Sequence, residues 1–289
     1  MQKYKVVIIG SGIAGMTAAI YLKRGGIEPV IIENSAPGGN LNIIPNIENY
    51  PGFENISGPD LAMNIYNQVN SLGIKYLFRN INEINLDKKT IDNEIEYDYL
   101  IIATGRKPRL LNLENEDKLL GNGVSTCALC DGSFYKNKDV IVVGGSSSAL
   151  TESLYLSTIC NSVTVIIRRD KFTGEEYLID KVSKKSNIKV INNSNITNYN
   201  TNDNKLISVT LDNGEIVNTD GVFLALGGIP NSDLFDLEKE EGYILVDNKY
   251  ETTYKDVFAI GDVINKDYYQ LINASSEGMI AASTIIDRE

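Results

Sequence analysis

Two cysteines separated by two residues carry the clearest chemical potential in the sequence. Cys127-Ala128-Leu129-Cys130 is followed directly by Asp131. Thiols at this spacing can close a small disulfide ring, so that one thiolate attacks a partner disulfide and the other resolves the mixed disulfide. A zinc half-site would need a second cysteine pair, and a structural disulfide is disfavoured in a reducing cytosol. The pattern therefore favours a reactive dithiol over both alternatives.

The composition narrows the chemistry that can surround this pair. The 289 residues include three cysteines and no histidine, which excludes Ser-His-Asp sites, histidine-ligated metals and an imidazole base. Three cysteines are too few for a four-cysteine zinc or iron–sulfur site, so no metal is expected. Asp131 is then the nearest group able to carry a proton for the thiols. Cys160, alone in an apolar setting, is expected to be a buried core residue.

Charge and hydropathy restrict the partners and the location. With 27 Lys+Arg against 38 Asp+Glu, the net charge is −11, which argues against binding to nucleic acid or to an anionic membrane. The uncharged run from Val6 to Leu22 is broken by glycines and is shorter than the roughly 20 residues of a membrane span. We therefore expect a cytoplasmic protein with no membrane segment.

A glycine-rich turn near the start predicts a dinucleotide site. Gly10-Ser11-Gly12-Ile13-Ala14-Gly15 follows the apolar strand Lys5–Ile9 and opens a helix over Gly12–Leu22, and Glu33 ends the next strand, Pro29–Glu33. The first glycine permits the tight turn, the second admits a pyrophosphate, and the third lets the helix pack on the strand. The helix start offers N–H groups to the phosphates, and Glu33 can accept hydrogen bonds from a ribose.

A second unit of the same kind begins at Gly144. It has a strand at Asp139–Val143, a helix at Ala149–Leu156 and a strand at Val163–Ile167. Two strand–helix–strand units in a chain of this length predict an α/β protein with two Rossmann-like, three-layer domains.

The remaining segments fit into these two domains. Short strands are expected within Ile81–Ile102, and Asp212-Asn213-Gly214 predicts a hairpin. A buried strand at Val257–Ile260 leads into Gly261-Asp262, and Ala274–Asp287 is expected to be helical. Asn192–Asn204, rich in Asn and Thr, is expected to be a polar loop.

Taken together, these motifs resemble those of the low-molecular-weight thioredoxin reductases over essentially the whole chain. The supporting segments are Gly10–Gly15, Pro37–Leu41, Ile47–Gly52, Ala103–Gly105, Cys127–Gly132 and Gly261–Val263. The resemblance implies FAD at the first glycine turn, with Asp262 bonded to the ribityl chain. It implies that Cys130 faces the flavin, that Cys127 attacks the disulfide of thioredoxin, and that Asp131 is the acid/base. The residues expected to hold FAD are Gly10, Ser11, Gly12, Ala14, Gly15, Glu33, Gly38, Gly39, Asn40, Leu41, Asn49, Ala103, Thr104, Gly105, Gly261, Asp262, Tyr269, Gln270 and Leu271.

The family also places NADPH at the second glycine turn, and here the sequence departs. The family pattern G-G-G-x-x-A appears as Gly144-Gly145-Ser146-Ser147-Ser148-Ala149, and H-R-R-x-x-x-R appears as Ile167 to Thr173 with only its two central arginines kept. Losing one charge-assisted phosphate contact costs about 1.5–3 kcal/mol, or roughly ten- to hundred-fold in affinity. The family's Arg-Gln-Ala is Tyr269-Gln270-Leu271, which places an aromatic ring at the flavin site.

These departures resemble the ferredoxin-linked flavin thioredoxin reductases, which keep FAD and the cysteine pair but lose the nicotinamide motifs. We therefore expect reduced ferredoxin as the donor, with weak or absent NADPH binding. The alternative is an NADPH-dependent enzyme, and a remote one is a non-catalytic flavin redox sensor. Arg168–Lys189 holds seven basic residues against four acidic ones, and this segment is the hypothetical ferredoxin-docking patch.

The resemblance also sets the expected domain organisation. The FAD domain is expected over residues 1–113 and 243–289, with the inserted domain, which carries the cysteine pair, over 114–242. A homodimer is implied by the family alone.

Overall fold

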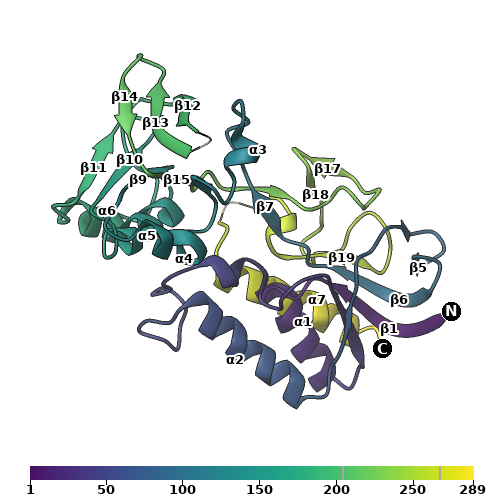
Figure 1. The fold of residues 1–289 in the computed structure, drawn as a ribbon. Coiled ribbons are helices and arrows are strands. Elements are labelled where there is room, and N and C mark those ends of the chain that lie inside the picture. The colour runs from purple at the N-terminus through teal and green to yellow at the C-terminus, as the bar shows by residue number, and fades with distance from the viewer. Residues whose placement is uncertain (204, 267) are drawn as a thin grey trace. The chain divides into compact units, whose positions relative to one another are not determined.

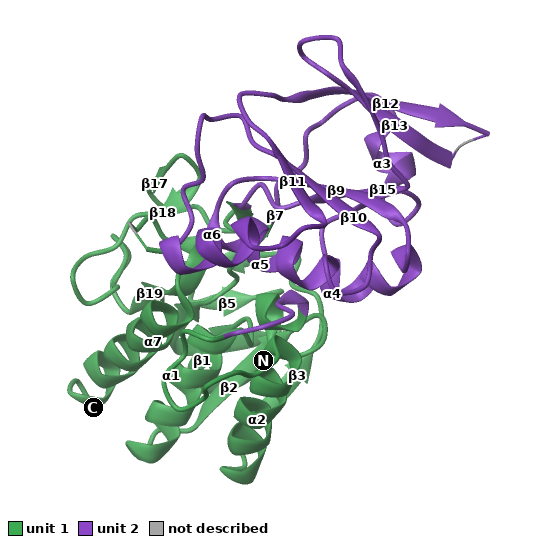
Figure 2. Cartoon of the chain, turned by 90° about the vertical axis from the view of Figure 1, so that its left-hand side faces the viewer, with its two compact units in different colours: residues 1–42, 48–107, 229–289 green, residues 43–47, 108–228 purple. Residues whose placement is uncertain are grey.

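The structure is a computed structural model that describes residues 1–203, 205–266 and 268–289. It contains two compact units, residues 1–42, 48–107 and 229–289 (unit 1) and residues 43–47 and 108–228 (unit 2) (Figure 2). The chain passes between them through β7 (Arg106–Pro108) and β16 (Gly228–Pro230), which pair with each other.

The main segment of unit 2, residues 108–228, begins and ends earlier in the chain than the expected inserted domain, residues 114–242. The expected limits are 113/114 and 242/243, whereas the units divide near 107/108 and 228/229. The apolar side chains explain this difference. Leu110, Leu111 and Leu113 pack against the core of unit 2, whereas Phe235 and Leu237 join the core of unit 1.

Unit 1 is built on a seven-stranded sheet in the order β3-β2-β1-β6-β5-β4, with β19 also paired to β6. Figure 1 labels β1, β5, β6 and β19 of this sheet. Strands β1, β2, β3, β6 and β19 are parallel to one another. Strand β5 is antiparallel to both of its neighbours, β6 and β4. The strands are β1 (Gln2–Ile9), β2 (Pro29–Glu33), β3 (Lys75–Phe78), β4 (Ile84–Asn85), β5 (Thr90–Ile91), β6 (Ile95–Ile102) and β19 (Val257–Ala259). The short pair β17 (Lys239–Glu240) and β18 (Tyr243–Ile244) stands apart.

Three helices lie side by side along this sheet (Figures 1 and 2). They are α1 (Ile13–Arg24), α2 (Gly58–Ser71) and α7 (Leu271–Ile286). Ser57 caps α2 by accepting a hydrogen bond from the Asp60 backbone N–H at 3.1 Å, as expected of a serine before a helix. The single-turn segments are η1 (Gly39–Ile43) and η3 (Gly261–Val263). The sheet is buried on both faces. Successive residues of β1 such as Val7 and Ile8 point to opposite faces, and both are fully buried.

Unit 2 repeats the parallel arrangement with a five-stranded sheet in the order β11-β10-β9-β15-β8. Its elements are α3 (Glu116–Leu119), β8 (Val124–Ser125), α4 (Ala128–Asp131), η2 (Gly132–Tyr135), β9 (Asp139–Val143), α5 (Ser147–Leu156), β10 (Ser162–Ile166), α6 (Glu176–Ser183), β11 (Ile188–Ile191) and β15 (Gly221–Leu224). The two-domain α/β prediction is confirmed. Within the described residues, no helix is long and apolar enough to cross a membrane.

An antiparallel sheet in unit 2 corrects one expectation. The expected polar loop Asn192–Asn204 contains β12 (Ile196–Asn202), which pairs with β13 (Lys205–Leu211); Asn204 itself lies outside the described residues. Ile196 and Tyr199 are buried in the core, while the asparagines and threonines between them are largely exposed. Two buried side chains are enough to anchor a strand whose other residues face solvent. The predicted hairpin from β13 to β14 (Ile216–Asn218) is confirmed, with Gly214 at φ +83°.

Candidate functional site

The first glycine turn joins β1 to α1, as predicted, and each glycine has a distinct environment. Gly10 has φ +100°, and a Cβ there would lie 2.4 Å from the Ala103 carbonyl oxygen. A Cβ on Gly15 would lie 2.1 Å from the Gly10 carbonyl oxygen, so the helix and the turn are in direct backbone contact. A Cβ on Gly12 would meet nothing within 4 Å. The turn is therefore sealed on its inner side and open at Gly12, where a pyrophosphate is expected.

Glu33, the expected ribose-binding acid, lies at the end of β2 and holds the turn together. Its Oε2 accepts hydrogen bonds from the Ser11 backbone N–H at 2.8 Å and from the Ser11 hydroxyl at 2.7 Å. Its Oε1 accepts from the backbone N–H groups of Asn34 and Ser35. The carboxylate is buried, and these donors satisfy it beside the glycine turn.

The segment Gly38–Leu41 lies against the first glycine turn. The Gly38 N–H donates to the Ser11 carbonyl at 2.9 Å, and a Cβ on Gly39 would sit 3.4 Å from Cα of Gly12. Leu41 is buried, and the Asn40 amide donates to the Arg106 carbonyl at 3.4 Å. The structure thus brings this predicted segment to the predicted turn.

The expected residues that directly follow β6, those at the start of α7, and Asn49 also lie in unit 1. Ala103 closes over Gly10, and the Thr104 hydroxyl donates to the Asn231 carbonyl at 2.7 Å. Asn49 and Gln270, 221 positions apart, are joined by a hydrogen bond of 3.2 Å from Nδ2 to Oε1. Leu271 begins α7.

Asp262, the residue expected to bond the ribityl chain, lies in η3 between two cations. Its Oδ2 is 3.1 Å from Arg106 Nε and 3.0 Å from Arg106 Nη2, while its Oδ1 is 3.6 Å from Lys266 Nζ. Gly261, at φ +76°, donates its N–H to Glu277 Oε2 at 2.7 Å. Lys266 Nζ is 2.9 and 3.0 Å from the two Glu277 oxygens.

Tyr269 lies beside this charged cluster. The guanidinium carbon of Arg106 is 4.1 Å from the centre of its ring, and Tyr243 packs at 5.8 Å between ring centres. Burial, with hydrogen bonding to Tyr243, raises the pKa of Tyr269 above its usual range. The preceding residue, Tyr268, is 71% exposed.

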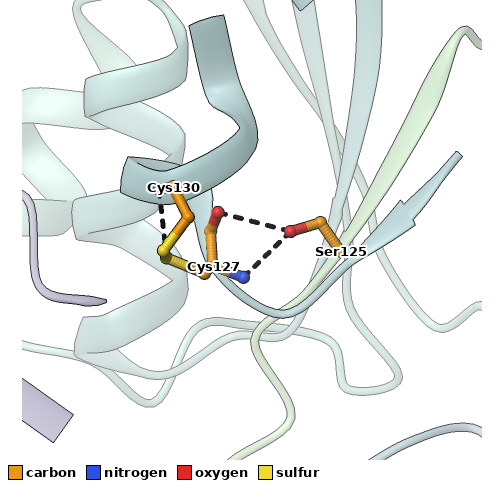
Figure 3. The surroundings of a disulfide bond; sticks show 3 residues. All are labelled: Ser125, Cys127 and Cys130. Carbon is orange, nitrogen blue, oxygen red and sulfur yellow. Dashed lines mark hydrogen bonds between the residues drawn. A yellow bond between two sulfur atoms is a disulfide. The ribbon is translucent and has the colours of Figure 1, made fainter. Parts of the chain in front are cut away.

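The cysteine pair lies in unit 2 between β8 and η2, and it forms a disulfide with a Cα–Cα distance of 5.3 Å (Figure 3). Cys127 caps the N-terminus of α4, and its Sγ accepts a hydrogen bond from the Cys130 backbone N–H at 3.0 Å. Ser125 Oγ accepts from the Cys127 N–H at 3.0 Å and donates to the Cys127 carbonyl at 3.3 Å. Cys127 is buried, whereas Cys130 is exposed. An N–H directed at Cys127 Sγ stabilises a thiolate on that sulfur when the disulfide opens.

The surroundings of the disulfide include a proton-carrying group and an exposed ring. Asp131 is partly exposed at the end of α4, and Phe134, three residues later, is 72% exposed. Cys160 is buried in the core of unit 2, as predicted, and burial raises the pKa of its thiol to about 11. It is therefore protonated and unreactive near neutral pH.

The second glycine turn joins β9 to α5, and the chain itself covers it. The N–H groups of Thr173 and Gly174 both donate to the Gly145 carbonyl, at 2.8 and 3.1 Å. The Glu175 N–H donates to Ser147 Oγ at 3.1 Å, and a Cβ on Gly174 would lie 2.8 Å from the Ser147 backbone nitrogen. Residues 173–175 thus pack on the first turn of α5, where a pyrophosphate would otherwise find N–H groups.

Several contributors to these sites were not predicted from the sequence. Ser125, Arg106, Asn231, Lys266 and Glu277 all bond to predicted site residues. Two of them had a local signal. Ser125 stands two residues before the Cys127 amide that it accepts from, a common serine turn. Glu277 is the only acidic residue in an otherwise uncharged helix, which favours a buried role with a partner.

Comparison with known proteins agrees with this geometry. Residues 4–278 match the family model described as "Pyridine nucleotide-disulphide oxidoreductase". The chain is 39% identical to the thioredoxin reductase of Rickettsia conorii, with 96% of each chain covered, and 35% identical to that of Bacillus subtilis, with 98% and 93% covered.

Solved structures of the same kind are also similar. The thioredoxin reductase of Lactococcus lactis, in its FR conformation, matches with a TM-score of 0.93 and 33% identity over 99% of this chain and 100% of that one. A ferredoxin-flavin thioredoxin reductase from Clostridium acetobutylicum matches with a TM-score of 0.54 and 29% identity over 100% and 98%.

Proposed function

The chain belongs to the low-molecular-weight thioredoxin reductases within the pyridine nucleotide-disulphide oxidoreductases, and we propose that it transfers electrons from NADPH to the disulfide of thioredoxin. It is an FAD-dependent oxidoreductase, as the family is. The observation that supports the disulfide chemistry best is the Cys127–Cys130 bond, with the Cys130 N–H directed at Cys127 Sγ. NADPH is favoured as the donor because the similar proteins of Rickettsia conorii and Bacillus subtilis are named plain thioredoxin reductases and the matching family is named for pyridine nucleotides.

The residues of unit 1 fit FAD. The turn is open at Gly12 and closed by backbone at Gly10 and Gly15, which leaves one side for a pyrophosphate. In our proposal the turn and α1 hold the phosphates, Glu33 and Ser11 lie toward the adenosine ribose, and Asp262, Asn49 and Gln270 lie toward the flavin half. When bound, FAD would supply the redox chemistry that passes two electrons from the donor to the Cys127–Cys130 disulfide, which opens to the dithiol with the uptake of protons.

The reduction of thioredoxin is a pair of thiol–disulfide exchanges. The Cys127 thiolate attacks one sulfur of the thioredoxin disulfide, whose S–S bond breaks and leaves a thiolate on thioredoxin. Asp131 is proposed to deliver the proton that this leaving thiolate takes up. The Cys130 thiolate then attacks Cys127 Sγ, which re-forms the Cys127–Cys130 disulfide and releases the second thioredoxin sulfur as a thiolate that takes up a proton. Two electrons and two protons therefore reach thioredoxin.

An anaerobic absorbance experiment tests the proposal and the donor together. The purified flavoprotein is mixed with excess NADPH, or with reduced ferredoxin, and thioredoxin thiols are then counted. Bleaching of the flavin band by NADPH followed by thiol formation is expected. Cys127→Ser and Cys130→Ser should each abolish thiol formation, whereas the matched control Cys160→Ser should not. If thiols form with neither donor, the chain is not a thioredoxin reductase.

A ferredoxin donor is the second candidate, and residues 173–175 favour it. Their contacts with Gly145 and Ser147 cover the start of α5, and Ile167 and Thr173 replace a histidine and an arginine of the family pattern. Bleaching by ferredoxin but not by NADPH would establish this candidate and overturn the NADPH proposal.

The basic segment 168–189 is the hypothetical docking site for that donor. Two of its charges already have partners, because Lys184 Nζ is 2.5 Å from Asp180 and Lys181 lies over the Tyr177 ring. If ferredoxin docks there, Lys184→Glu with Lys185→Glu should slow ferredoxin-driven turnover in a salt-dependent way. An unchanged rate would remove this segment from the proposal.

A further inference from the structure

Arg106 forms an ion pair with Asp262 in the candidate FAD site. It stands on β7, directly after the Ala103–Gly105 turn that packs against Gly10. Its Nε and Nη2 atoms both point at Asp262 Oδ2, at 3.1 and 3.0 Å, and the two side chains are only 21% and 23% exposed. One charge-assisted hydrogen bond from Nε and a second close ion contact from Nη2, both at low exposure, fix the two side chains more firmly than a surface pair would.

Tyr269 holds the same guanidinium from another side. Its ring centre is 4.1 Å from the guanidinium carbon, within the range of a cation–π contact, and Tyr243 supports the ring in turn. A guanidinium fixed by a carboxylate and by a ring has one orientation, which is how a protein prepares a group for a ligand in advance.

The charges around Asp262 show why a cation is needed there. The pyrophosphate of FAD brings negative charge to a site that already holds the carboxylates of Glu33, Asp262 and Glu277. Lys266 is the other described cation of this cluster, but both of its short contacts, at 2.9 and 3.0 Å, go to Glu277, and Asp262 lies at 3.6 Å. Arg106 is therefore the cation that mainly balances Asp262.

We propose that Arg106 is a positioning residue of the FAD site, which orients and neutralises Asp262 for the cofactor, and that Tyr269 holds Arg106 in place. The inference rests on the proposed function, because it takes FAD as the ligand. It assigns a role to a residue that the sequence motifs did not single out.

FAD affinity of the full-length apoprotein is the measurement that tests this role. The dissociation constant is obtained by titrating FAD into the apoprotein and following flavin fluorescence. Arg106→Met removes the charge at similar length and should raise the constant about ten- to hundred-fold, as expected for a lost charge-assisted bond. Arg106→Lys should give a smaller increase. The matched control is Lys107→Met, because Lys107 is the next residue and its side chain is 55% exposed.

Relocation of the charge separates positioning from a merely structural role. Since position 269 is 4.1 Å from the guanidinium, Tyr269→Arg added to Arg106→Met returns a cation to the same place and should recover most of the affinity. No recovery, with Arg106→Met still weak, would show a structural role and overturn the proposal.

An equal or tighter FAD constant in Arg106→Met would also overturn it, since Arg106 would then compete with FAD for Asp262. Failure of the proposed function is distinguishable, because the parent protein would then bind no FAD or leave thioredoxin oxidised. If the Met variant does not fold, Arg106→Lys and Tyr269→Leu decide by the same titration, and an unchanged constant in both overturns the role.

Discussion

At the level of single residues, the first glycine turn separates two reasons for having glycine. Gly15 lacks room for a side chain because the Gly10 carbonyl oxygen is 2.1 Å from where a Cβ would stand. Gly12 has ordinary backbone angles, and a Cβ there would meet nothing within 4 Å, so the protein itself does not require glycine at this position. We therefore expect the requirement for glycine at position 12 to come from a ligand that approaches the backbone.

Alanine substitutions should therefore affect different quantities at these two positions, namely FAD affinity at Gly12 and protein stability at Gly15. Gly12→Ala should leave the unfolding free energy of the apoprotein within about 0.5 kcal/mol of the parent and weaken FAD binding at least about tenfold. Gly15→Ala should lower the unfolding free energy by several kcal/mol, because backbone must move. Urea unfolding of the apoproteins and FAD titration measure the two effects. Equal FAD affinity in Gly12→Ala would place the pyrophosphate elsewhere.

Phe134 is the exposed ring nearest in sequence to the disulfide, and we expect it to contact thioredoxin. An exposed aromatic side chain is a frequent anchor of protein–protein contacts. Phe134→Ala should raise the KM for thioredoxin about three- to tenfold and leave the rate of flavin reduction by the donor unchanged. Ile216→Ala, at another exposed apolar residue of unit 2, should change neither. A KM that is unchanged in Phe134→Ala would exclude the ring from the docking surface.

Sequence motifs predicted where the candidate site residues lie in the fold, but not the bonds between them. The glycine turn, Glu33, the cysteine pair and Asp262 are placed where their motifs predict. Arg106 was not predicted, because its role depends on the contact with Asp262 and Tyr269, more than 150 positions away. Asn49 and Gln270 were both predicted, but their mutual hydrogen bond follows only from the fold.

At the level of secondary structure, Glu277 of helix α7 forms a buried ion pair with Lys266, which precedes the helix. The sequence of α7 only suggests this pair. Glu277 is 3% exposed, and it binds both Lys266 and the Gly261 N–H that precedes Asp262. Removing Glu277 leaves the largely buried Lys266 with only its longer contact to Asp262, at 3.6 Å. This pair therefore links the stability of α7 to the geometry of η3.

Substitution of Glu277 alone should lower the unfolding free energy strongly, and substitution of both Glu277 and Lys266 should lower it much less. Glu277→Leu is expected to lower the unfolding free energy by about 3–5 kcal/mol, since Lys266 remains charged. Adding Lys266→Met should recover most of the loss. Breaking the exposed Lys184–Asp180 pair with Lys184→Met should cost less than about 1 kcal/mol. Urea unfolding of the four proteins decides, and a small loss in Glu277→Leu would show that Lys266 reaches water.

Glu152 on α5 should make the stability of the protein fall as pH rises, which is opposite to the usual effect of a carboxyl group. Glu152 Oε2 is enclosed and has no hydrogen-bond partner among the described residues, and burial raises the pKa of Glu152 to about 8. Because the unfolded chain releases this proton near pH 4.5, stability is lost as pH rises from about 4.5 to 8.

Glu152→Gln should remove this dependence. The variant should match the parent below about pH 4 and exceed it by up to about 3 kcal/mol at pH 7. Glu176→Gln, at an exposed glutamate on α6, should show no such divergence. Urea unfolding across this pH range measures both, and parallel pH curves for Glu152→Gln and the parent would show that the carboxyl is solvated in the folded protein.

Strand β12 shows where pattern-based prediction of elements fails. Its polar residues predict a loop, but pairing with β13 satisfies the backbone, and Ile196 and Tyr199 supply the buried contacts. The strands around the glycine turns were predictable because they are apolar on both faces. An edge strand with few buried residues lacks that pattern, and its pairing partner decides its structure.

At the level of the whole molecule, the two glycine turns belong to separately packed units. Every residue expected to hold FAD belongs to unit 1, whereas the disulfide and the second glycine turn belong to unit 2. The number of domains follows from the two repeated units in the sequence. Their limits do not, because Leu110, Leu111 and Leu113 after the first crossing, and Phe235 and Leu237 after the second, decide which core each segment joins.

This separation predicts that donor preference can be changed without disturbing FAD. Thr173→Arg returns the arginine of the family pattern to unit 2 and should add one charge-assisted bond to the 2′-phosphate of NADPH. The KM for NADPH should then fall about ten- to hundred-fold, while FAD affinity and the KM for NADH, which lacks that phosphate, stay unchanged. Anaerobic flavin reduction with each nucleotide measures these values. An equal gain with NADH would mean that the substitution acts by displacing residues 173–175 from Gly145, and no gain with either would mean that this segment keeps the nucleotide away from the second glycine turn.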